Sequence, residues 1–234
     1  MMSSMKSVVI GFVLGCLLPL QACGTTYRAE SIEAWVVDAE TAQPIEGLVV
    51  TANWELEEGT VGGNRPAGQI MVMETVTDNK GRFYFSAWGP KSTPLTFPVP
   101  LTSEPHLVNR DPHLLFFKSG YKWLGLENSF SADYNKSSLR KSDWNGKIIK
   151  MARFVGDGKE YAWNLTQLSN SMGYAFRAEN CEWKQTPRIL ALLFSEADAL
   201  HGRGVYIGSI RDAMSLPKQE KCGSALEFFK DYRK

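Results

Sequence analysis

Residues 70–85 read Ile-Met-Val-Met-Glu-Thr-Val-Thr-Asp-Asn-Lys-Gly-Arg-Phe-Tyr-Phe. Two runs of mostly β-branched, aromatic and other apolar residues flank a polar segment that ends in glycine. Gly81 can adopt a positive φ without steric cost, and the side chains of Asp78 and Asn79 can bond to their own backbone. The stretch therefore predicts two strands joined by a tight turn, as in a β-hairpin.

The same β signal continues on both sides of this stretch. Further runs that favour strands, separated by turn residues and without a helical period, lie at residues 32–38, 45–54, 113–118 and 147–154. Several short strands with turn signals between them are typical of a sandwich. We therefore expect an antiparallel β-sandwich over residues 32–154.

Two segments inside this region favour loops instead of strands. Gly59–Gly68 is predicted to be a short loop. Residues 86–112 hold prolines at positions 90, 94, 98, 100, 105 and 112, which is too many for a central strand. We expect a long excursion that runs extended along an edge of the sandwich. Long loops in compact domains often carry function, so this segment is a candidate binding surface.

Four segments resemble successive strands of the carboxypeptidase regulatory-like domain, a transthyretin-like β-sandwich: Val36–Asp38, Pro44–Ala52, Thr77–Phe85 and Phe116–Tyr121. Their order and spacing agree with the family. Ala34 stands where the family often has Gly, and Ser119 stands where Pro usually precedes Gly-Tyr. The resemblance implies a non-catalytic accessory or binding module, since the metal and the catalytic residues of carboxypeptidases belong to a different domain.

After Gly156 the hydrophobic period becomes helical. One helical face is predicted from the spacing of Tyr161, Leu165, Leu168 and Met172. Thr186-Pro187 has the residue types of an N-cap followed by a first-turn proline, and Ser224 with Glu227 forms the pattern of a capping box. Residues 157–234 are thus predicted to form a small helical subdomain, which makes the whole chain an α+β protein.

The amino-terminal residues 1–22 have the features of a signal peptide. Lys6 provides a short basic region, and the apolar run Val8–Leu20 is too short to span a bilayer comfortably. Leu20-Gln21-Ala22-Cys23 resembles the bacterial lipobox, in which a peptidase cuts before a cysteine whose sulfur carries a diacylglycerol. We expect Cys23 to become the acylated first residue, with 23–31 as a lipidated tether.

Two alternatives to this cleavage site stay open. A second box ends at Cys16 but leaves a much shorter apolar region after Lys6, and cleavage near Ala22 without acylation would give a plain secreted protein. Gly24 is not the Asp that sorting rules associate with retention in the inner membrane. The resemblance therefore implies an outer-membrane lipoprotein that faces the periplasm.

Cys181 and Cys222 are the remaining cysteines of the expected mature chain. In an oxidising compartment two such residues are expected to form a disulfide, which would link the starts of the second and third predicted helices. A pair of free buried thiols is the alternative.

Composition and charge exclude some classes of partner. The chain has 234 residues, of which 44% are hydrophobic and 22% charged, as in a globular protein of one large or two small domains. Its 26 Lys and Arg residues against 25 Asp and Glu residues give a net charge of +1. Because no excess of positive charge is present to attract a phosphate backbone, we do not expect a nucleic acid partner.

Catalytic and metal-binding patterns are weak. His106 and His113 flank Asp111 and together offer ligand types that zinc accepts, but the set lies in a proline-bounded loop and no His-Glu-x-x-His is present. Ser119–Lys122 and Ser138–Lys141 match Ser-x-x-Lys, yet they lie at a strand end and in a polar loop instead of on a buried helix turn. No phosphate-binding or dinucleotide-binding glycine motif occurs. We expect no metal, no cofactor and no enzyme activity.

Aromatic residues are the remaining candidates for binding. Trp35 and Trp163 lie in strongly patterned elements and are expected in the core. Trp88, Trp123 and Trp144 lie beside glycine or polar residues in predicted loops, where exposed rings would stack on sugars or anchor a protein partner.

Three functional hypotheses follow from these patterns. The first is a lipid-anchored, non-catalytic protein of the cell envelope that binds a protein partner or takes part in an assembly. The second is a lipoprotein that binds a carbohydrate, either peptidoglycan or an exported glycan, through the three tryptophans. The third and least favoured is an unrecognised hydrolase.

The lipobox generates a direct prediction. Cys23→Ser should abolish membrane association and leave the fold intact, because acyl chains and not protein surface would provide the anchor. Fractionation of cells that express either form checks this. A variant that still sediments with membranes after a high-salt wash would contradict the lipoprotein interpretation.

Overall fold

The computed structural model describes residues 24–94, 102–108, 110–129, 137–177, 181–206, 208, 210–211, 216 and 220–232. Its strands are β1 (Thr26–Ala29), β2 (Ile32–Asp38), β3 (Val49–Thr60), β4 (Gly63–Val76), β5 (Arg82–Phe85), β6 (Trp88–Ser92), β7 (His106–Leu107), β8 (His113–Phe117), β9 (Leu124–Leu126), β10 (Leu139–Arg140) and β11 (Ile148–Met151). The helices are α1 (Gly158–Ser171), α2 (Pro187–Gly202) and α3 (Ala225–Lys230), with the 3-10 turns η2 (Gly173–Phe176), η3 (Glu182–Gln185) and η5 (Glu220–Cys222).

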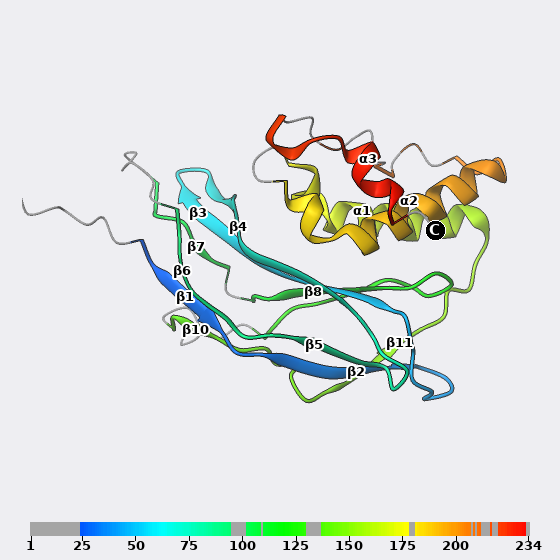
Figure 1. Ribbon diagram of the computed structural model, residues 1–234, viewed down its shortest axis with the longest axis horizontal. Coiled ribbons are helices and arrows are strands. Elements are labelled where there is room, and N and C mark those ends of the chain that lie inside the picture. Colours follow the sequence, from blue (N-terminus) through cyan, green and yellow to red (C-terminus); the bar gives the residue numbers. More distant parts are fainter. Residues whose placement is uncertain are drawn as a thin grey trace, which may run out of the picture.

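The strands form two layers of a β-sandwich (Figure 1). The larger sheet has the order β4-β3-β8-β9, with β7 also paired to β3. Two three-stranded sheets, β11-β2-β5 and β10-β1-β6, follow one another below it. The α+β class and the sandwich are therefore confirmed, and the helices form a third layer above the larger sheet.

Strand β3 has both of its faces buried over most of its length. Val50, Ala52, Trp54 and Leu56 point into the core between the two sheet layers. Val49 points to the other side, into the core that the helices share with the sheet. Successive side chains of a strand point to opposite faces, so one strand serves both cores. The helices therefore pack directly on the sandwich.

The turn at Asp78 forms as predicted, but it does not close a hairpin. The Asp78 carboxylate accepts hydrogen bonds from the backbone N–H groups of Lys80 and Arg82 at 2.9 Å each. Gly81 has φ +70° and its carbonyl accepts from the backbone N–H of Val36 at 2.8 Å, so its contact is with β2. A Cβ at Gly81 would lie 2.3 Å from the Val36 carbonyl oxygen. The chain therefore crosses from the larger sheet to the smaller one, where β5 pairs with β2.

Three further expectations about the strands are corrected. Two strand pairs, β1 with β10 and β2 with β11, are parallel, because long connections bring the later strand back in the same direction. Gly59–Gly68 is not a loop, since the β3–β4 hairpin continues to the pair Thr60 and Gly63. The expected tether 23–31 contains β1, which pairs with β6 of the Pro-rich excursion.

The predicted helical face and one of the two predicted caps are found. Tyr161, Leu165, Leu168 and Met172 are all buried in the core that helices and sheet share. The Ser224 hydroxyl accepts from the backbone N–H of Glu227 at 3.3 Å at the start of α3. Trp163, expected in the core, is 66% exposed because it lies two residues after Tyr161 and so points away from the packed face.

Helix α2 is capped by the sandwich and not by Thr186, which makes no capping hydrogen bond through its side chain. The two carboxylate oxygens of Glu74 on β4 accept from the backbone N–H groups of Arg188 and Ile189, at 2.9 Å each. These are first-turn donors that no carbonyl of the helix can satisfy. Glu74 therefore fixes the start of α2 on the sheet.

The disulfide between Cys181 and Cys222 is confirmed. The two Cα atoms are 5.6 Å apart, and the bridge closes a loop of 41 residues. On the chain-entropy model a loop of this length stabilises the fold by about 4 kcal/mol. The bridge joins η3, just before α2, to η5, just before α3.

The Glu74 cap predicts a specific pH dependence. Burial raises the pKa of Glu74 from 4.5 to about 7, and the hydrogen bonds and charge at Arg188 and Ile189 offset only part of this effect. The folded state thus binds this proton more tightly than the unfolded chain, and the resulting stabilisation is lost as the pH rises from 4.5 through about 7. We expect Glu74→Gln to flatten the fall of the melting temperature over this range.

Melting curves of both forms across this pH range check the expectation. Glu40→Gln, at an exposed site, serves as the matched control and should keep the wild-type profile. An unchanged profile for Glu74→Gln would show that the buried carboxyl does not titrate in this range.

Candidate functional site

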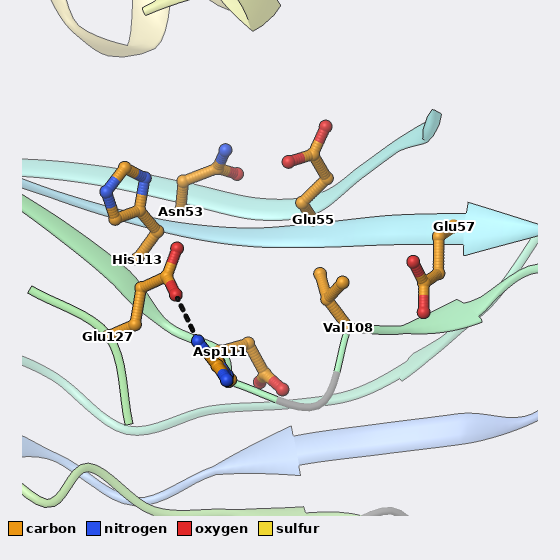
Figure 2. A pocket seen from close by; sticks show the side chains of 8 residues that line it. Asn53, Glu55, Glu57, Val108, Asp111, His113 and Glu127 are labelled. Atoms are coloured by element: carbon orange, nitrogen blue, oxygen red, sulfur yellow. Dashed lines mark ion pairs between the residues drawn. The ribbon is translucent and has the colours of Figure 1, made fainter. Parts of the chain in front are cut away.

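A cavity of about 260 Å³ lies on the outer face of the larger sheet (Figure 2). Asn53, Glu55 and Glu57 form its floor from every second position of β3. They lie on the same face of β3 as Val49. At Val49, at the start of the strand, the helices cover this face. The floor of the cavity is therefore the polar continuation of a strand face that begins as core.

Three other segments close the cavity. His113 comes from the start of β8, which pairs with β3 so that His113 lies opposite Asn53. Glu127 follows β9. Residues 108, 110 and 111 contribute the remaining wall between β7 and β8. Paired strands hold half of these positions, so backbone hydrogen bonding fixes that part of the site.

The carboxylates of the cavity have cationic or ionisable partners on its margin. Glu55 Oε1 lies 3.2 Å from Arg177 Nη1, and Glu127 Oε2 lies 3.8 Å from Arg110 Nη1. Glu57 Oε1 lies 3.4 Å from Nε2 of His106, which is a cation only when it is protonated. Burial raises the pKa of Glu55 above its usual value, although Arg177 acts in the opposite direction.

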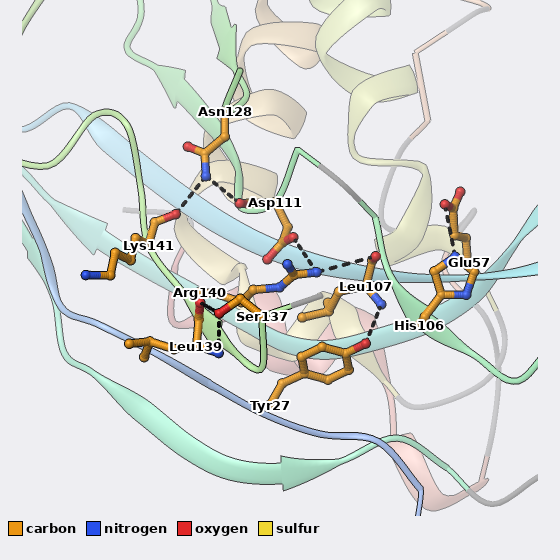
Figure 3. A network of polar contacts seen from close by, with 10 residues as sticks. All are labelled: Tyr27, Glu57, His106, Leu107, Asp111, Asn128, Ser137, Leu139, Arg140 and Lys141. Atoms are coloured by element: carbon orange, nitrogen blue, oxygen red, sulfur yellow. Dashed lines mark hydrogen bonds and ion pairs between the residues drawn. The ribbon is translucent and has the colours of Figure 1, made fainter. Parts of the chain in front are cut away.

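A buried ion pair supports the wall at Asp111 (Figure 3). Asp111 Oδ1 lies 3.3 Å from Arg140 Nη2, and both side chains are almost fully buried. Burial raises the pKa of Asp111 to about 7, and the charge of Arg140 lowers it by less than that. The Arg140 guanidinium also lies 5.2 Å from the ring centroid of Tyr27 on β1. The pair therefore connects the cavity wall to the second sheet layer.

Asn128 ties the same wall to the segment after β10. Its side-chain amide donates to the backbone carbonyls of Asp111 and Lys141, at 2.7 Å each. Its amide oxygen accepts from the backbone N–H of Asp143 at 2.9 Å. With these bonds a loop segment is held in one position beside the cavity (Figure 3).

Asn53 is the most deeply buried residue of the cavity floor. One polar atom of its side chain lacks a hydrogen-bond partner among the described residues. The residue is 4% exposed, and its Oδ1 has no hydrogen-bond partner in the structure. Figure 2 shows this amide between His113 and Glu55, with the oxygen on the side of Glu55. Burial lowers the pKa of His113, and Glu127 opposes this effect.

The three tryptophans proposed for binding do not form one surface. Trp88 is 7% exposed and packs edge-on against Trp54, with ring centroids 5.3 Å apart, so its expected exposure is wrong. Trp144 is half-buried and its indole N–H donates to the Glu127 carbonyl at 3.0 Å. Trp123 is half-buried near the cavity: a Cβ built on Gly125 would lie 3.0 Å from its ring and 3.1 Å from His113 Nε2.

Other predicted site residues are placed as follows. Asp111 and His113 line the cavity, His106 contacts it through Glu57, and within the described ranges no group of three or more His, Cys, Asp or Glu side chains has the geometry to hold a metal ion. Ser119 lies past the far end of β8 from His113 and lines a different cavity. Cys23 lies outside the described residues.

One expected core residue also faces outward. Trp35 is half-buried, because its neighbours Ala34 and Val36 occupy the inward-facing positions of β2.

Among the described residues, no helix combines the length and the apolar character that crossing a membrane requires.

The sequence contained a signal for this site that the strand prediction did not use. Asn53, Glu55 and Glu57 alternate with Trp54 and Leu56, which is the pattern of a strand with one buried and one polar face. Because the prediction ends the strand at residue 54, it leaves Glu55 and Glu57 outside the alternating pattern. What the sequence could not show is that β8 and the segment after β9 place His113 and Glu127 on the same face.

Comparisons with known proteins identify no family. No family model matches the sequence, and no curated protein matches it. The fold is similar to 3-chlorocatechol 1,2-dioxygenase from Rhodococcus opacus 1CP, with 14% identity and a TM-score of 0.30 over 58% of this chain and 63% of the dioxygenase. Catechol 1,2-dioxygenase from Acinetobacter radioresistens is 13% identical, with a TM-score of 0.28 over 56% of this chain and 53% of the dioxygenase.

A third structure with similarity is the C-terminal domain of a shaft pilin from Lactobacillus rhamnosus GG, at 14% identity and a TM-score of 0.24, over 56% of this chain and 99% of the domain. This chain covers less than two thirds of the dioxygenases that it matches. TM-scores of this size carry no argument about family or activity.

The buried pair at the wall generates a prediction about stability. Arg140→Met should destabilise the fold by about 3 to 5 kcal/mol, because it leaves the Asp111 carboxyl buried without its partner. The double variant with Asp111→Leu should recover most of that loss, since both buried charges are then gone. Urea denaturation of the single and double variants measures both effects.

Lys141→Met is the matched control for this experiment. Lys141 pairs with Glu30 at 3.0 Å, but both side chains are exposed. Its loss should cost less than about 1 kcal/mol. A similar cost for Arg140→Met would show that the buried pair does not support the wall.

Proposed function

We propose that this protein is a lipid-anchored, non-catalytic component of the cell envelope that binds its partner through the cavity on β3. The observation that carries the proposal is a concave site of fixed shape, with a deeply buried polar atom on its floor that has no hydrogen-bond partner among the described residues. Buried polar groups normally have hydrogen-bond partners, and a ligand can supply one. A few polar groups converging in a concave site are typical of binding sites.

Anchoring through Cys23 is the second part of the proposal. The lipobox-like stretch that ends at Cys23 supports it, as does the position of β1, which begins at Thr26. The backbone N–H of Thr93 donates to the carbonyl of Thr25 at 2.9 Å, so the chain pairs with the fold two residues after the proposed anchor. We propose an outer membrane location that faces the periplasm.

A transthyretin-like classification of the sandwich is also part of the proposal. The resemblance to the carboxypeptidase regulatory-like domain rests on segments that the structure assigns to β2, β3, β5 and β8. These strands contribute to both layers around one core. Such a module would act by binding, which agrees with the protein partner that we propose.

Carbohydrate binding is the alternative, and one observation favours it. The half-buried Trp123 ring lies near His113, at the edge of the cavity. A tryptophan beside acceptor groups would suit a sugar, with the ring on its apolar face. A hydrolase remains the least favoured alternative, because Ser119 and His113 lie at opposite ends of β8.

The proposal is tested by filling the cavity. Val108 lines it, so Val108→Trp should block the site without changing its charge. The matched control is Val61→Trp at the tip of the β3–β4 hairpin, where the side chain is 81% exposed. Partners that copurify from membranes in mild detergent with the wild type and the control should be lost with Val108→Trp.

The outcomes separate the hypotheses. Equal recovery of the same partners by all three forms would contradict the cavity as the binding site. Loss of glycan binding in both Val108→Trp and Trp123→Leu would favour the carbohydrate alternative. If the cellular role disappears on substitution of Ser119 alone, at wild-type stability, the non-catalytic proposal is wrong.

A further inference from the structure

The cavity on β3 presents hydrogen-bond acceptors to whatever enters it. Its floor carries the carboxylates of Glu55 and Glu57 and the unpartnered amide oxygen of Asn53, and its side wall carries the carboxylate of Glu127. Ionised carboxylates accept hydrogen bonds and cannot donate them. An anionic ligand or one without donors is therefore poorly matched to these walls.

The partners that the protein itself supplies to these acceptors are incomplete. Arg177 and Arg110 are partly exposed cations, and the ion pairs that they form at 3.2 and 3.8 Å are of the kind that contributes little in water. Among the described residues, the ion-pair partner of Glu57, whose side chain is 17% exposed, is the His106 imidazole. That imidazole is a cation only when it is protonated.

The most deeply buried acceptor of the cavity is the amide oxygen of Asn53, which takes part in none of these ion pairs. Asn53 is neutral and 4% exposed, and its Oδ1 has no hydrogen-bond partner in the part of the chain that the structure describes. Along β3 Asn53 lies two positions, about 7 Å, from Glu55 and four positions, about 13 Å, from Glu57, so one compact group can meet Asn53 and Glu55 together but not Glu57 as well. Such a group must carry several donors. The ammonium group has three N–H donors and the guanidinium group has five.

We propose that the cavity binds a primary ammonium or guanidinium group between the Asn53 amide oxygen and the carboxylate of Glu55, with the carboxylate of Glu57 further along the same face of β3. The inference rests on the proposed function, since it names the chemistry of the ligand for the same site. A volume of about 260 Å³ lies below the roughly 300 to 1,000 Å³ of pockets for drug-sized ligands, so one basic side chain or a small amine suits it.

The desolvated state of Glu55 supports the same ligand chemistry. Burial raises the pKa of this carboxyl even though Arg177 is beside it, which shows that the charged form lacks solvation in the cavity. A bound cation supplies the favourable field that the missing water does not provide. Binding should therefore lower the pKa of Glu55.

The experiment measures binding of simple probes to the purified full chain in detergent, by calorimetry at low salt. Cadaverine and a blocked Gly-Lys-Gly peptide carry the ammonium group, while pentanediol and glutarate are the neutral and anionic controls. Both amines should bind and both controls should not. Tighter binding of the peptide would indicate a side chain of a protein partner as the source, and tighter binding of cadaverine a free amine.

Variants locate the binding. Glu55→Gln and Asn53→Leu should each weaken amine binding by about tenfold or more, the loss expected when a charged or buried contact is removed. Glu58→Gln is the matched control, because Glu58 lies three positions after Glu55 on β3, points to the other face and pairs with Arg65 at 2.6 Å. Its affinity should stay within about twofold of the wild type.

Failure of this inference differs from failure of the proposed function. Preference for glutarate or pentanediol over the amines, or amine binding that Glu55→Gln and Asn53→Leu leave unchanged in folded protein, would overturn the ligand chemistry alone. In that case Val108→Trp would still remove the membrane partner. Retention of that partner by Val108→Trp would instead overturn the cavity as the site of function.

Discussion

The alternation of side chains along β3 is the constraint on which the other parts of the structure depend. Its inward positions stay apolar from Val50 to Leu56, which keeps the two sheet layers together. Its outward positions begin with Val49 and Thr51, which are buried, and continue with the polar residues Asn53, Glu55 and Glu57. A helix layer can cover only the apolar part without burying unpaired charges, so the cavity begins where that layer no longer matches the strand.

The helix layer is held on the sheet by contacts at its starting points. Glu74 from β4 satisfies two donors at the first turn of α2. The disulfide then restrains the segments that precede α2 and α3. Short helices have little stability of their own in water, so their positions come from the sheet that they cover. This fixed position also places Arg177, just after η2, beside Glu55 at the cavity margin.

The parts that were predictable from sequence are those that depend on neighbouring residues. The strand at Ile32–Asp38, the turn at Asp78 and the face of α1 follow from local period and turn chemistry, and the structure has all three. The pairing of β5 with β2 instead of β4 depends on the contact of Gly81 with Val36, which no local pattern encodes. The cap from Glu74 joins residues 114 and 115 positions apart, so sequence assigned it to the adjacent Thr186.

The cavity also depends on long-range pairing, and this places it near the proposed anchor. Tyr27 of β1 lies with its hydroxyl 3.5 Å from the backbone N–H of Leu107, the residue before the cavity wall at Val108. The chain between Cys23 and Tyr27 spans at most about 14 Å when fully extended. An acylated Cys23 would therefore hold the cavity close to the membrane surface. A partner that is itself bound to the membrane meets such a site at a much higher effective concentration than a soluble one, since tethering confines both to the same layer.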